Sequence, residues 1–277
     1  MSLTSKSLVL DLLSTLPEGR AVPVGALVRA AGLLGIGENS LRVSLARLRA
    51  RGLVESRERG LYCMGAAAQA LNRTVRSWRG VENEVRDWDG GWVGVQAEGP
   101  TGRGGAKRRA TALRLLGFRP LVGSLLLRPD NLVGGVETVR ERLASLEIGS
   151  QLLVFGLGEL DALHDARARA LWDVAELESG YEASIAALEA SEARLPSLAP
   201  EAAMAESFRQ GGEVVRQIVL DPLLPAPILD TAKRSRLVET MRRYDVLGRE
   251  CWKSWAGETV ELEMTPSEGS GLAAALA

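Results

Sequence analysis

Residues 22–62 read VPVGALVRAAGLLGIGENSLRVSLARLRARGLVESRERGLY, and this stretch decides the fold of the first part of the chain. Apolar residues within Leu27–Leu34 predict a short helix, Gly35–Gly37 a turn, and Glu38–Arg51 a second helix. Short segments within Leu53–Cys63 then predict a strand, a tight turn and a returning strand. Helix, turn, helix and β-hairpin in this order are typical of a winged helix-turn-helix, so double-stranded DNA is the first partner to consider.

The second helix of this stretch separates an apolar face from a basic face. At about 100° per residue, Leu41, Leu45 and Leu48 cluster on one side. The opposite side holds the candidates for reading base edges, which are Asn39, Arg42, Val43 and Arg47. Arginine pairs with guanine, asparagine pairs with adenine, and valine can contact a thymine methyl group in the major groove. The predicted phosphate contacts are Ser40, Ser44, Arg49 and Arg51, and the wing residues predicted to reach backbone or minor groove are Arg57 and Arg59. The alternative is a winged helix used for protein contacts or as scaffolding.

Composition and charge support a DNA-binding head on a separate body. The chain has 277 residues, 46% of them hydrophobic, which predicts two or three domains with real cores. Residues 1–80 contain 12 lysines and arginines against 5 acidic residues, a net charge of +7, and the whole chain carries −1, which leaves −8 for the rest. A basic head on an acidic body is typical of a DNA reader with a regulatory part, although surface charge can also vary by chance.

Cysteine usage and hydropathy are both consistent with a cytoplasmic protein. Cys63 and Cys251 lie far apart and outside metal or redox spacings, which favours buried, reduced thiols. No uncharged apolar run approaches the roughly 18 residues of a membrane helix, and the N-terminus lacks the pattern of an export signal. We therefore expect a cytoplasmic protein with no membrane partner.

The rest of the chain predicts an α+β protein with further units. The expected boundaries are a DNA-binding domain at 1–64, a linker helix at 65–87, a middle domain at 88–158, a helical domain at 159–264 and a flexible tail at 265–277. The middle segment alternates as β-α-β-β-α-β, the order of a ferredoxin-like fold with two helices on one antiparallel sheet. The third segment is mainly helical, and we expect it to hold dimerisation and effector binding.

The sequence contains only weak matches to catalytic and cofactor-binding motifs. The glycine-rich loop Gly99–Gly105 precedes a helix, but Ala106 separates Gly105 from Lys107, so it fits neither a Walker loop nor a dinucleotide fingerprint. Asp161, His164 and Asp165 could share one helix face, yet the chain has a single histidine, and a solvated helix start explains them better. We predict no catalytic residue, no metal site and no cofactor.

Aromatic and basic residues gather in the third segment, which is the candidate effector site. The candidates are Trp172, Tyr181, Arg234, Arg236, Arg243, Tyr244 and Trp252. An apolar cavity rimmed by arginines would suit an amphiphilic anion, with rings burying an organic group and guanidinium groups holding phosphates or a carboxylate. The alternative is an ordinary helical core with a solvated face.

The segment Asn39–Leu48, followed by Gly52–Glu55, resembles the recognition helix and wing of the PaaX-like repressors, the regulator family of phenylacetic acid degradation. Trp88-Asp89-Gly90, Trp172-Asp173 and Asp221-Pro222-Leu223-Leu224-Pro225 are also similar to that family. The resemblance implies a Cas2-type ferredoxin fold in the middle unit. It also implies a homodimeric repressor on an inverted repeat, released from DNA by an aryl-acyl coenzyme A thioester such as phenylacetyl-CoA.

The sequence departs from that pattern at two places. Gly37 stands where a capping serine or threonine is usual, and Val95–Glu98 lacks the aspartate that a Cas2-type nuclease needs, so we expect no nuclease activity. The alternative function is a metal-dependent nuclease or another nucleic-acid enzyme built on the ferredoxin-like unit. In a third hypothesis, the chain binds DNA through the same module, and the rest of the chain serves only for contacts with other proteins.

Overall fold

The protein is described from a computed structural model. The structure describes residues 4–14, 20–66, 68–69, 77–97, 103–146, 148 and 152–256. The chain divides into two compact units: unit 1 comprises residues 1–79, 184–219 and 238–277, and unit 2 comprises residues 80–183 and 220–237. Within the described residues, no helix is long and apolar enough to cross a membrane.

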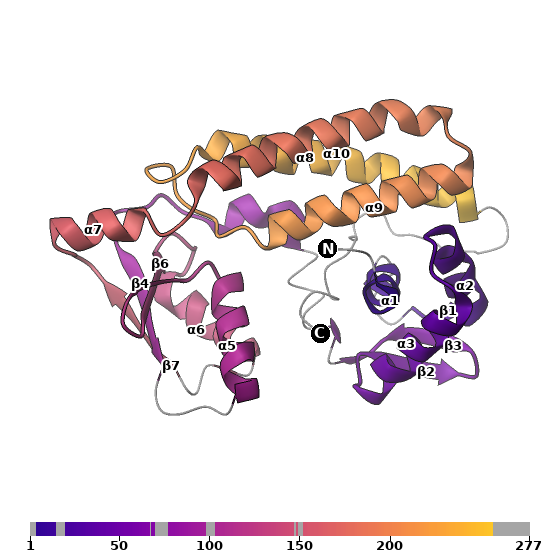
Figure 1. Cartoon of the computed structure of the whole chain (residues 1–277), viewed down its shortest axis with the longest axis horizontal. Coiled ribbons are helices and arrows are strands. Elements are labelled where there is room, and N and C mark those ends of the chain that lie inside the picture. Colours follow the sequence, from indigo (N-terminus) through magenta and orange to yellow (C-terminus); the bar gives the residue numbers. More distant parts are fainter. Residues whose placement is uncertain are drawn as a thin grey trace. The chain divides into compact units, whose positions relative to one another are not determined.

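The N-terminal part of unit 1 contains three helices and a small sheet (Figure 1). The helices are α1 (Ser5–Ser14), α2 (Val24–Leu33) and α3 (Glu38–Ala50), and the strands are β1 (Val22–Pro23), β2 (Val54–Glu58) and β3 (Leu61–Met64). The sheet is antiparallel in the order β1-β3-β2. The order α2, α3, β2, β3 is the one predicted for residues 22–62. The helix α1 precedes it, and β1 is too short for residue alternation to reveal.

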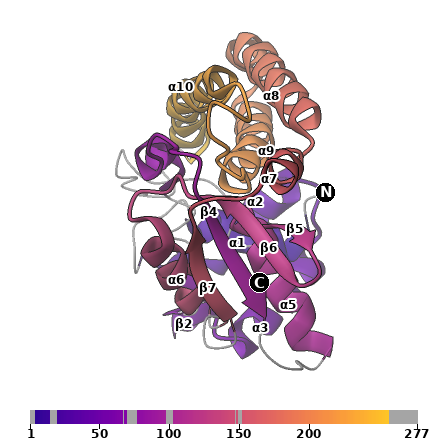
Figure 2. The ribbon, with the colours of Figure 1, turned by 90° about the vertical axis from the view of Figure 1, so that its left-hand side faces the viewer.

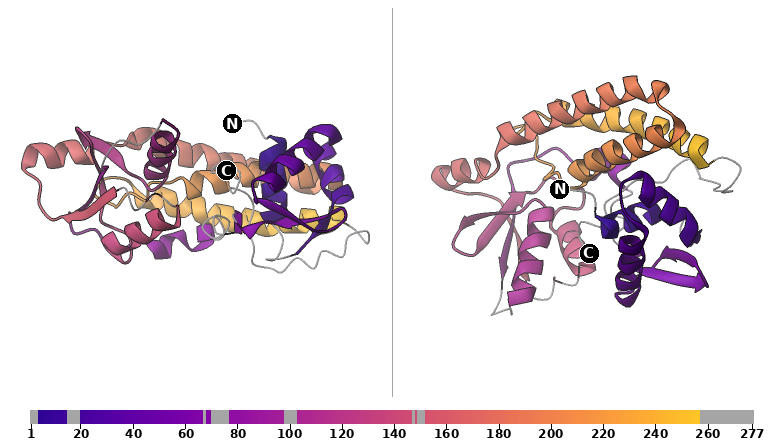
Figure 3. Two further views of the ribbon diagram at one scale, coloured as in Figure 1. Left: turned by 90° about the horizontal axis from the view of Figure 1, so that it is seen from below. Right: turned by 45° about the vertical axis from the view of Figure 1, so that its right-hand side comes forward.

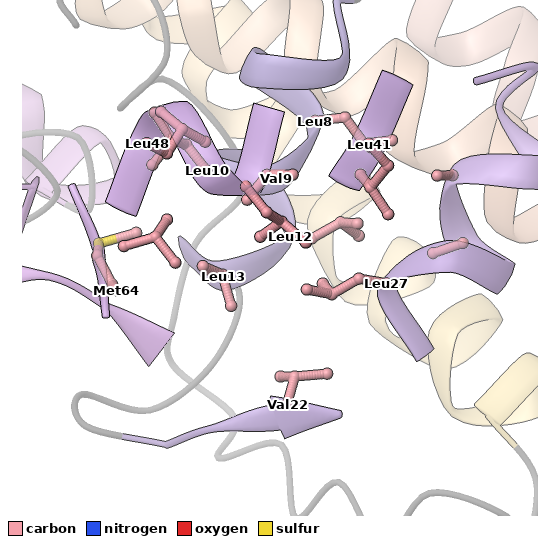
Figure 4. Packing of buried hydrophobic residues seen from close by; sticks show 14 of the residues in the cluster. Leu8, Val9, Leu10, Leu12, Leu13, Val22, Leu27, Leu41, Leu48 and Met64 are labelled. Atoms are coloured by element: carbon pink, nitrogen blue, oxygen red, sulfur yellow. The ribbon is translucent and has the colours of Figure 1, made fainter. Parts of the chain in front are cut away.

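One apolar core fixes α3 to the rest of unit 1, and Figure 4 shows leucines of α1 and α3 pointing toward one another. Leu8 and Leu41 are both fully buried, and Leu12 and Leu48 are nearly so. The helix α9 (Pro200–Val219) adds Met204 and Phe208 to the same core. Each buried leucine contributes about 1.5–3 kcal/mol, so α3 is held mainly by its apolar face.

The other described residues of unit 1 are mainly helical and include parts of two long helices. These are α8 (Val174–Arg194) and α10 (Thr231–Ala256), and the 3₁₀ turn η3 (Leu195–Ser197) follows α8. Residues 184–194 of α8 and 238–256 of α10 belong to unit 1. The linker region predicted as one helix contains a 3₁₀ helix, η1 (Ser77–Glu84), and residues 70–76 before it lie outside the described part.

Unit 2 is built on a four-stranded antiparallel sheet. Its elements are β4 (Trp92–Ala97), α5 (Arg103–Leu115), β5 (Arg119–Val122), β6 (Leu125–Pro129), α6 (Gly135–Ser145) and β7 (Leu152–Leu157). The strand order is β5-β6-β4-β7, and both helices lie on one face of the sheet (Figure 2). This β-α-β-β-α-β order is the one that the sequence predicts.

Aromatic side chains pack on the central strand of this sheet. Trp92 of β4 stacks on Trp172 with ring centroids 6.4 Å apart, and Trp88 meets Trp92 edge to face at 5.1 Å. The short helix α7 (Ala162–Arg169) contributes Asp165, which accepts a hydrogen bond from Trp92 Nε1 at 3.3 Å. Aromatic pairs of this kind add about 0.5–1.5 kcal/mol beyond their burial, so the tryptophans brace the start of the sheet.

Candidate nucleic-acid interface

Helix α3 presents a leucine face inward and a basic face outward. Leu41, Leu45 and Leu48 are at most 2% exposed. The helix begins at Glu38, and the preceding residue Gly37 offers no side-chain cap. The turn before it contains Gly35, whose φ of 76° lies in the left-handed region that glycine adopts without strain. In Figures 1 and 3, α3 and the β2–β3 hairpin lie on the side of unit 1 away from α9. The leucines therefore orient the basic face away from the core.

The side chains predicted to read bases are all exposed. They are Asn39, Arg42, Val43 and Arg47, and Val43 is 49% exposed although it is apolar. An exposed valine beside arginines can contact thymine methyl groups while the guanidinium groups bind guanine. The structure thus brings the four candidates together on one accessible face.

The arginines of this face differ in their partners. Arg42 pairs with Glu38 one turn earlier at 2.7 Å, with both side chains more than half exposed. Within the described residues, Arg47, Arg49 and Arg51 form no ion pair. An exposed i,i+4 pair contributes only about 0.3–0.5 kcal/mol, so Arg42 can leave Glu38 at small cost.

Two of the predicted phosphate contacts are serines whose hydroxyls form hydrogen bonds with α1. Ser44 is 9% exposed, and its hydroxyl lies 2.7 Å from that of Ser5. Ser40 is exposed but donates a hydrogen bond to the same Ser5 hydroxyl at 3.1 Å. Sequence reasoning missed this cluster, which fixes α3 to α1. The position of Ser44 on the helical wheel, next to Leu48, is the signal that could have revealed its burial.

The β2–β3 hairpin carries the other two predicted arginines. Arg57 and Arg59 are exposed, and Gly60 makes the turn with a φ of 83°. The strand register shifts between Ser56 and Glu58, so Arg57 occupies a β-bulge. A bulge bends its strand and redirects side chains, which here sets the direction of the wing.

Two glycines hold the end of α3 against the chain leaving the hairpin. Gly52 has a φ of 68° and Gly65 donates a backbone hydrogen bond to Leu53 at 2.9 Å. A Cβ atom at Gly65 would lie 2.2 Å from the carbonyl oxygen of Gly52. Only glycine fits at this crossing, which fixes the angle between α3 and the wing.

A further cation lies close to the end of α3. Burial lowers the pKa of Lys6 on α1, and the nearby Arg51 charge lowers it further. Sequence reasoning did not include Lys6, because it lies far from Arg51 in the chain. Its charge extends the basic face toward α1.

The part of the chain that carries this interface is similar to a known protein family. A protein-family model described as PaaX-like protein matches residues 4–67. Residues 4–67 are therefore similar to this family, and we call them the PaaX-like domain. The match covers α1, both helices of the predicted helix-turn-helix and the hairpin, so the resemblance stated for Asn39–Leu48 is confirmed for this part of the chain.

A solved structure extends the likeness to the other regions. The structure titled uncharacterized protein Rv0674 from Mycobacterium tuberculosis is similar over 91% of this chain and 100% of its own, with a TM-score of 0.57 and 21% identity. At this identity the match supports the fold alone. Among curated proteins no match was found.

Outside the PaaX-like domain, the structure distributes the predicted effector residues over both units. Trp172, Tyr181, Arg234 and Arg236 lie in unit 2, whereas Arg243, Tyr244 and Trp252 lie in unit 1. Arg236 and Arg243 are exposed, Trp252 is half-buried, and the other four are buried. The two groups are therefore described separately.

In unit 2, the buried members of the set bind one another and the backbone. The Tyr181 hydroxyl donates to Asp221, and Arg234 donates to the Leu224 carbonyl at 2.8 Å, with Asp221 at 3.8 Å. Burial raises the pKa of Tyr181, and the Asp221 charge raises it further. Trp172 donates to the carbonyl oxygen of Gly117 at 3.2 Å. These polar groups have internal partners, as buried polar groups require.

The loop that carries Asp221 is strained and held from both sides. Leu223 has a φ of 55°, which is unusual for a leucine. Its N–H donates to Asp221 at 2.8 Å, and its carbonyl accepts from Asn131 at 2.6 Å. Asn131 also accepts from the buried Arg128 at 3.3 Å. The network therefore links the loop to β6.

In unit 1, the predicted residues have similar internal partners. The hydroxyls of Tyr244 and Ser191 lie 2.7 Å apart, and Arg243 pairs with Glu192 at 3.1 Å. Trp252 meets Phe208 edge to face at 5.8 Å and packs against the core of the PaaX-like domain. Trp252 thus serves the packing of the domain that holds α3.

The candidate metal cluster is a helix start, as the sequence favoured. Asp161 caps α7 by accepting from the His164 N–H at 3.0 Å, and these hydrogen bonds lower the pKa of Asp161. Across the described part of the chain, no group of three or more histidine, cysteine, aspartate or glutamate residues could hold a metal ion. The glycine-rich loop at 98–102 lies outside the described residues, and α5 begins at Arg103.

Proposed function

We propose that this chain is a DNA-binding transcriptional regulator whose PaaX-like domain acts as a winged helix-turn-helix with α3 in the major groove. The observation that carries the proposal is the outward face of α3, where Arg47, Arg49 and Arg51 are exposed opposite an inner face of buried leucines. None of the three forms an ion pair with the residues that the structure describes, so their guanidinium groups can bind guanine edges and phosphates without breaking a described ion pair.

The exposed side chains divide into base-reading and backbone-binding groups. Asn39, Arg42, Val43 and Arg47 read base edges. Ser40, Arg49 and Arg51 contact phosphates from the same helix, and the wing arginines Arg57 and Arg59 reach the backbone or the minor groove. Ser44 is left out of this surface, because its hydroxyl is buried against Ser5.

The four-stranded unit is a ferredoxin-like domain of the Cas2 type. The strand order β5-β6-β4-β7 with both helices on one face supports this assignment. We further propose that the regulator is a cytoplasmic homodimer on an inverted repeat, since two identical heads require symmetric half-sites about one or more helical turns apart.

The effector in this proposal is an aryl-acyl-CoA thioester resembling phenylacetyl-CoA. The candidate contacts are Trp172, Tyr181, Arg234 and Arg236 in unit 2 and Arg243, Tyr244 and Trp252 in unit 1. Arg236 and Arg243 are the exposed members of the set, so the phosphates of such a ligand can reach them from solvent. Such an effector releases DNA only if it prefers the conformation that binds DNA poorly.

Footprinting on the DNA that flanks the gene tests this function. We expect a protected, two-fold symmetric site, loss of protection with Arg47→Ala, and release by phenylacetyl-CoA or a related thioester. Protection that acyl-CoA thioesters never change would contradict the effector but leave DNA binding intact. Cleavage of the labelled DNA with Mg²⁺ or Mn²⁺, abolished by a chelator, would instead favour the nuclease alternative.

A further inference from the structure

A cluster of hydrogen-bond donors in unit 1 lies apart from the outward face of α3 and from the candidate effector residues. It consists of Trp78 and Arg79 in η1 and of Asp245 and Arg249 on α10, and all four belong to unit 1. Asp245 is the single acceptor among these four side chains, because indole and guanidinium groups only donate. A cluster that is rich in donors and poor in acceptors favours a negatively charged partner.

The indole of Trp78 is buried without a partner for its N–H group. Trp78 is 1% exposed, and its Nε1 atom has no hydrogen-bond partner among the described residues. The indole N–H groups of Trp88, Trp92 and Trp172, by contrast, each donate to an oxygen of the chain. A buried donor without an acceptor costs free energy, so this exception requires an explanation.

A second unpartnered donor belongs to the adjacent side chain. The guanidinium carbon of Arg79 lies 4.7 Å from the centre of the Trp78 ring, and the buried Nη1 atom of Arg79 has no hydrogen-bond partner in the part of the chain that the structure describes. Its Nη2 atom donates to Asp245 Oδ2 at 2.6 Å, and Arg242 donates to the Arg79 carbonyl at 2.9 Å. These contacts hold Arg79 in place, so the unpartnered Nη1 is not the result of a loose side chain.

The charge of the cluster is positive, because two guanidinium groups share one carboxylate. Arg249 donates to the same Oδ2 atom of Asp245 at 2.5 Å, from one turn further along α10. Neither Arg79 nor Arg249 pairs with another acid among the described residues. The Asp245 side chain is 8% exposed, whereas those of Arg79 and Arg249 are 22% and 18% exposed, so the cluster is largely buried yet reaches solvent. One positive charge therefore remains where water screens it less than at an open surface.

We propose that Trp78, Arg79 and Arg249 form a binding site for a phosphoryl group, which we call the Trp78 site. A phosphoryl group is negatively charged and offers several acceptor oxygens, as three donating side chains require. The group is inorganic phosphate or part of a larger ligand. That this ligand is an acyl-CoA effector is a further step that rests on the proposed function, whereas the donor cluster is independent of it.

Isothermal titration calorimetry on the full-length protein tests this site. The probes are inorganic phosphate, pyrophosphate and coenzyme A, with acetate as a carboxylate reference, all at one ionic strength because salt screens charges. Trp78→Phe keeps an aromatic ring and removes only the N–H group, and Arg249→Gln removes one charge. We expect both variants to bind the phosphoryl probes about tenfold more weakly than wild type, or weaker still, since a hydrogen bond to a charged group is lost. The control Arg209→Gln removes an exposed arginine of α9 in the same unit, and its affinity should equal that of wild type.

Melting curves separate a loss of binding from a loss of folding. Without any phosphoryl compound, Trp78→Phe should melt at the same temperature as wild type or higher, because a donor without an acceptor is removed. Added pyrophosphate should raise the melting temperature of wild type and of Arg209→Gln more than that of Trp78→Phe. If Trp78→Phe melts lower than wild type without any phosphoryl compound, the N–H group already has a partner and the proposal is wrong.

The source of the phosphoryl group follows from which probe binds. Binding of coenzyme A that depends on Trp78 and Arg249 identifies a ligand that carries coenzyme A, and binding of phosphate or pyrophosphate but not of coenzyme A identifies a free phosphate. Either result supports the Trp78 site. Wild-type protein that binds no phosphoryl probe, binding that neither variant weakens, or acetate binding as tight as that of pyrophosphate would overturn it. None of these assays contains DNA, so their failure leaves the proposed function standing, and a failure of DNA binding leaves the Trp78 site untouched.

Discussion

The arginines of α3 and the arginine beside the Asp221 loop carry the same guanidinium group in opposite environments. On α3, arginines are exposed, and Arg47 has no ion pair in the part of the chain that the structure describes. In unit 2, Arg234 is buried with its donors on the Leu224 carbonyl and near Asp221. An arginine can therefore be assigned to a ligand site only when its burial and its partners are known. Buried charges should therefore control stability, and exposed charges should control DNA binding.

The largest expected effect is a loss of unfolding free energy when a buried charge loses its partner. Asp221→Ala leaves Arg234 buried without its carboxylate and removes an acceptor of the Tyr181 hydroxyl. Breaking such a pair costs roughly 3–5 kcal/mol, which chemical denaturation would measure as a loss of unfolding free energy. DNA affinity of the folded fraction should not change. A variant that stays stable but binds DNA with altered affinity would contradict this division between buried and exposed charges.

The second prediction concerns Asp11, a half-buried acid within the PaaX-like domain. Burial raises the pKa of Asp11 to about 7, with a smaller opposing effect from the Arg216 charge. Its Oδ1 atom is buried and has no hydrogen-bond partner among the described residues. Because the folded-state pKa exceeds the unfolded one, stability is fully present below about pH 4 and declines as the pH rises toward 7.

Asp11→Asn removes this titration. We expect the variant to gain roughly 2.5 kcal/mol over wild type between pH 5 and pH 8, as measured by denaturant unfolding at both values. Glu38→Gln is the control, since Glu38 is an exposed carboxylate in the same domain. An equal difference between Asp11→Asn and wild type at both pH values would show that Asp11 is ionised in the folded protein.

The third prediction addresses the exposed side. Arg47→Ala should weaken binding to the preferred DNA site by roughly 1–3 kcal/mol and relax one base position, without changing the melting temperature. Competition among operator variants measures both effects. Equal weakening on every sequence would reassign Arg47 to a phosphate.

The smallest expected effect lies at the wing. Arg59→Ala should reduce the salt dependence of DNA binding by about one unit of slope, since one phosphate contact is lost. Titrations at several salt concentrations measure this slope. If the slope stays the same, the wing does not contact the backbone and α3 alone carries the interface.

Much of the N-terminal architecture is predictable because hydrophobic periodicity and turn glycines dominate it. Leu41, Leu45 and Leu48 mark the inner face of α3, and Gly35 and Gly60 mark turns that the structure contains. Ser44 was misplaced because serine is polar, although its helical position beside Leu48 indicates burial. The two-residue strand β1 is too short to leave a periodic pattern.

The candidate effector residues could not be resolved in the same way. Residue types alone cannot tell whether Arg234 points to a ligand or to the Leu224 carbonyl, since the decisive partner is a backbone atom. Nor does sequence spacing separate Tyr181 from Tyr244, which the fold assigns to different units. Long-range contacts decide these roles, and they depend on tertiary packing.

The crossing of Gly52 and Gly65 carries a consequence for genetics. Neither glycine offers a side chain to a nucleic acid, yet a single methyl group at Gly65 would collide with the Gly52 carbonyl and tilt the helix that ends there. A random-mutagenesis selection for clones that have lost DNA binding should therefore recover substitutions at Gly65 alongside those at arginines. Melting curves would then separate the Gly65 variants from folding defects.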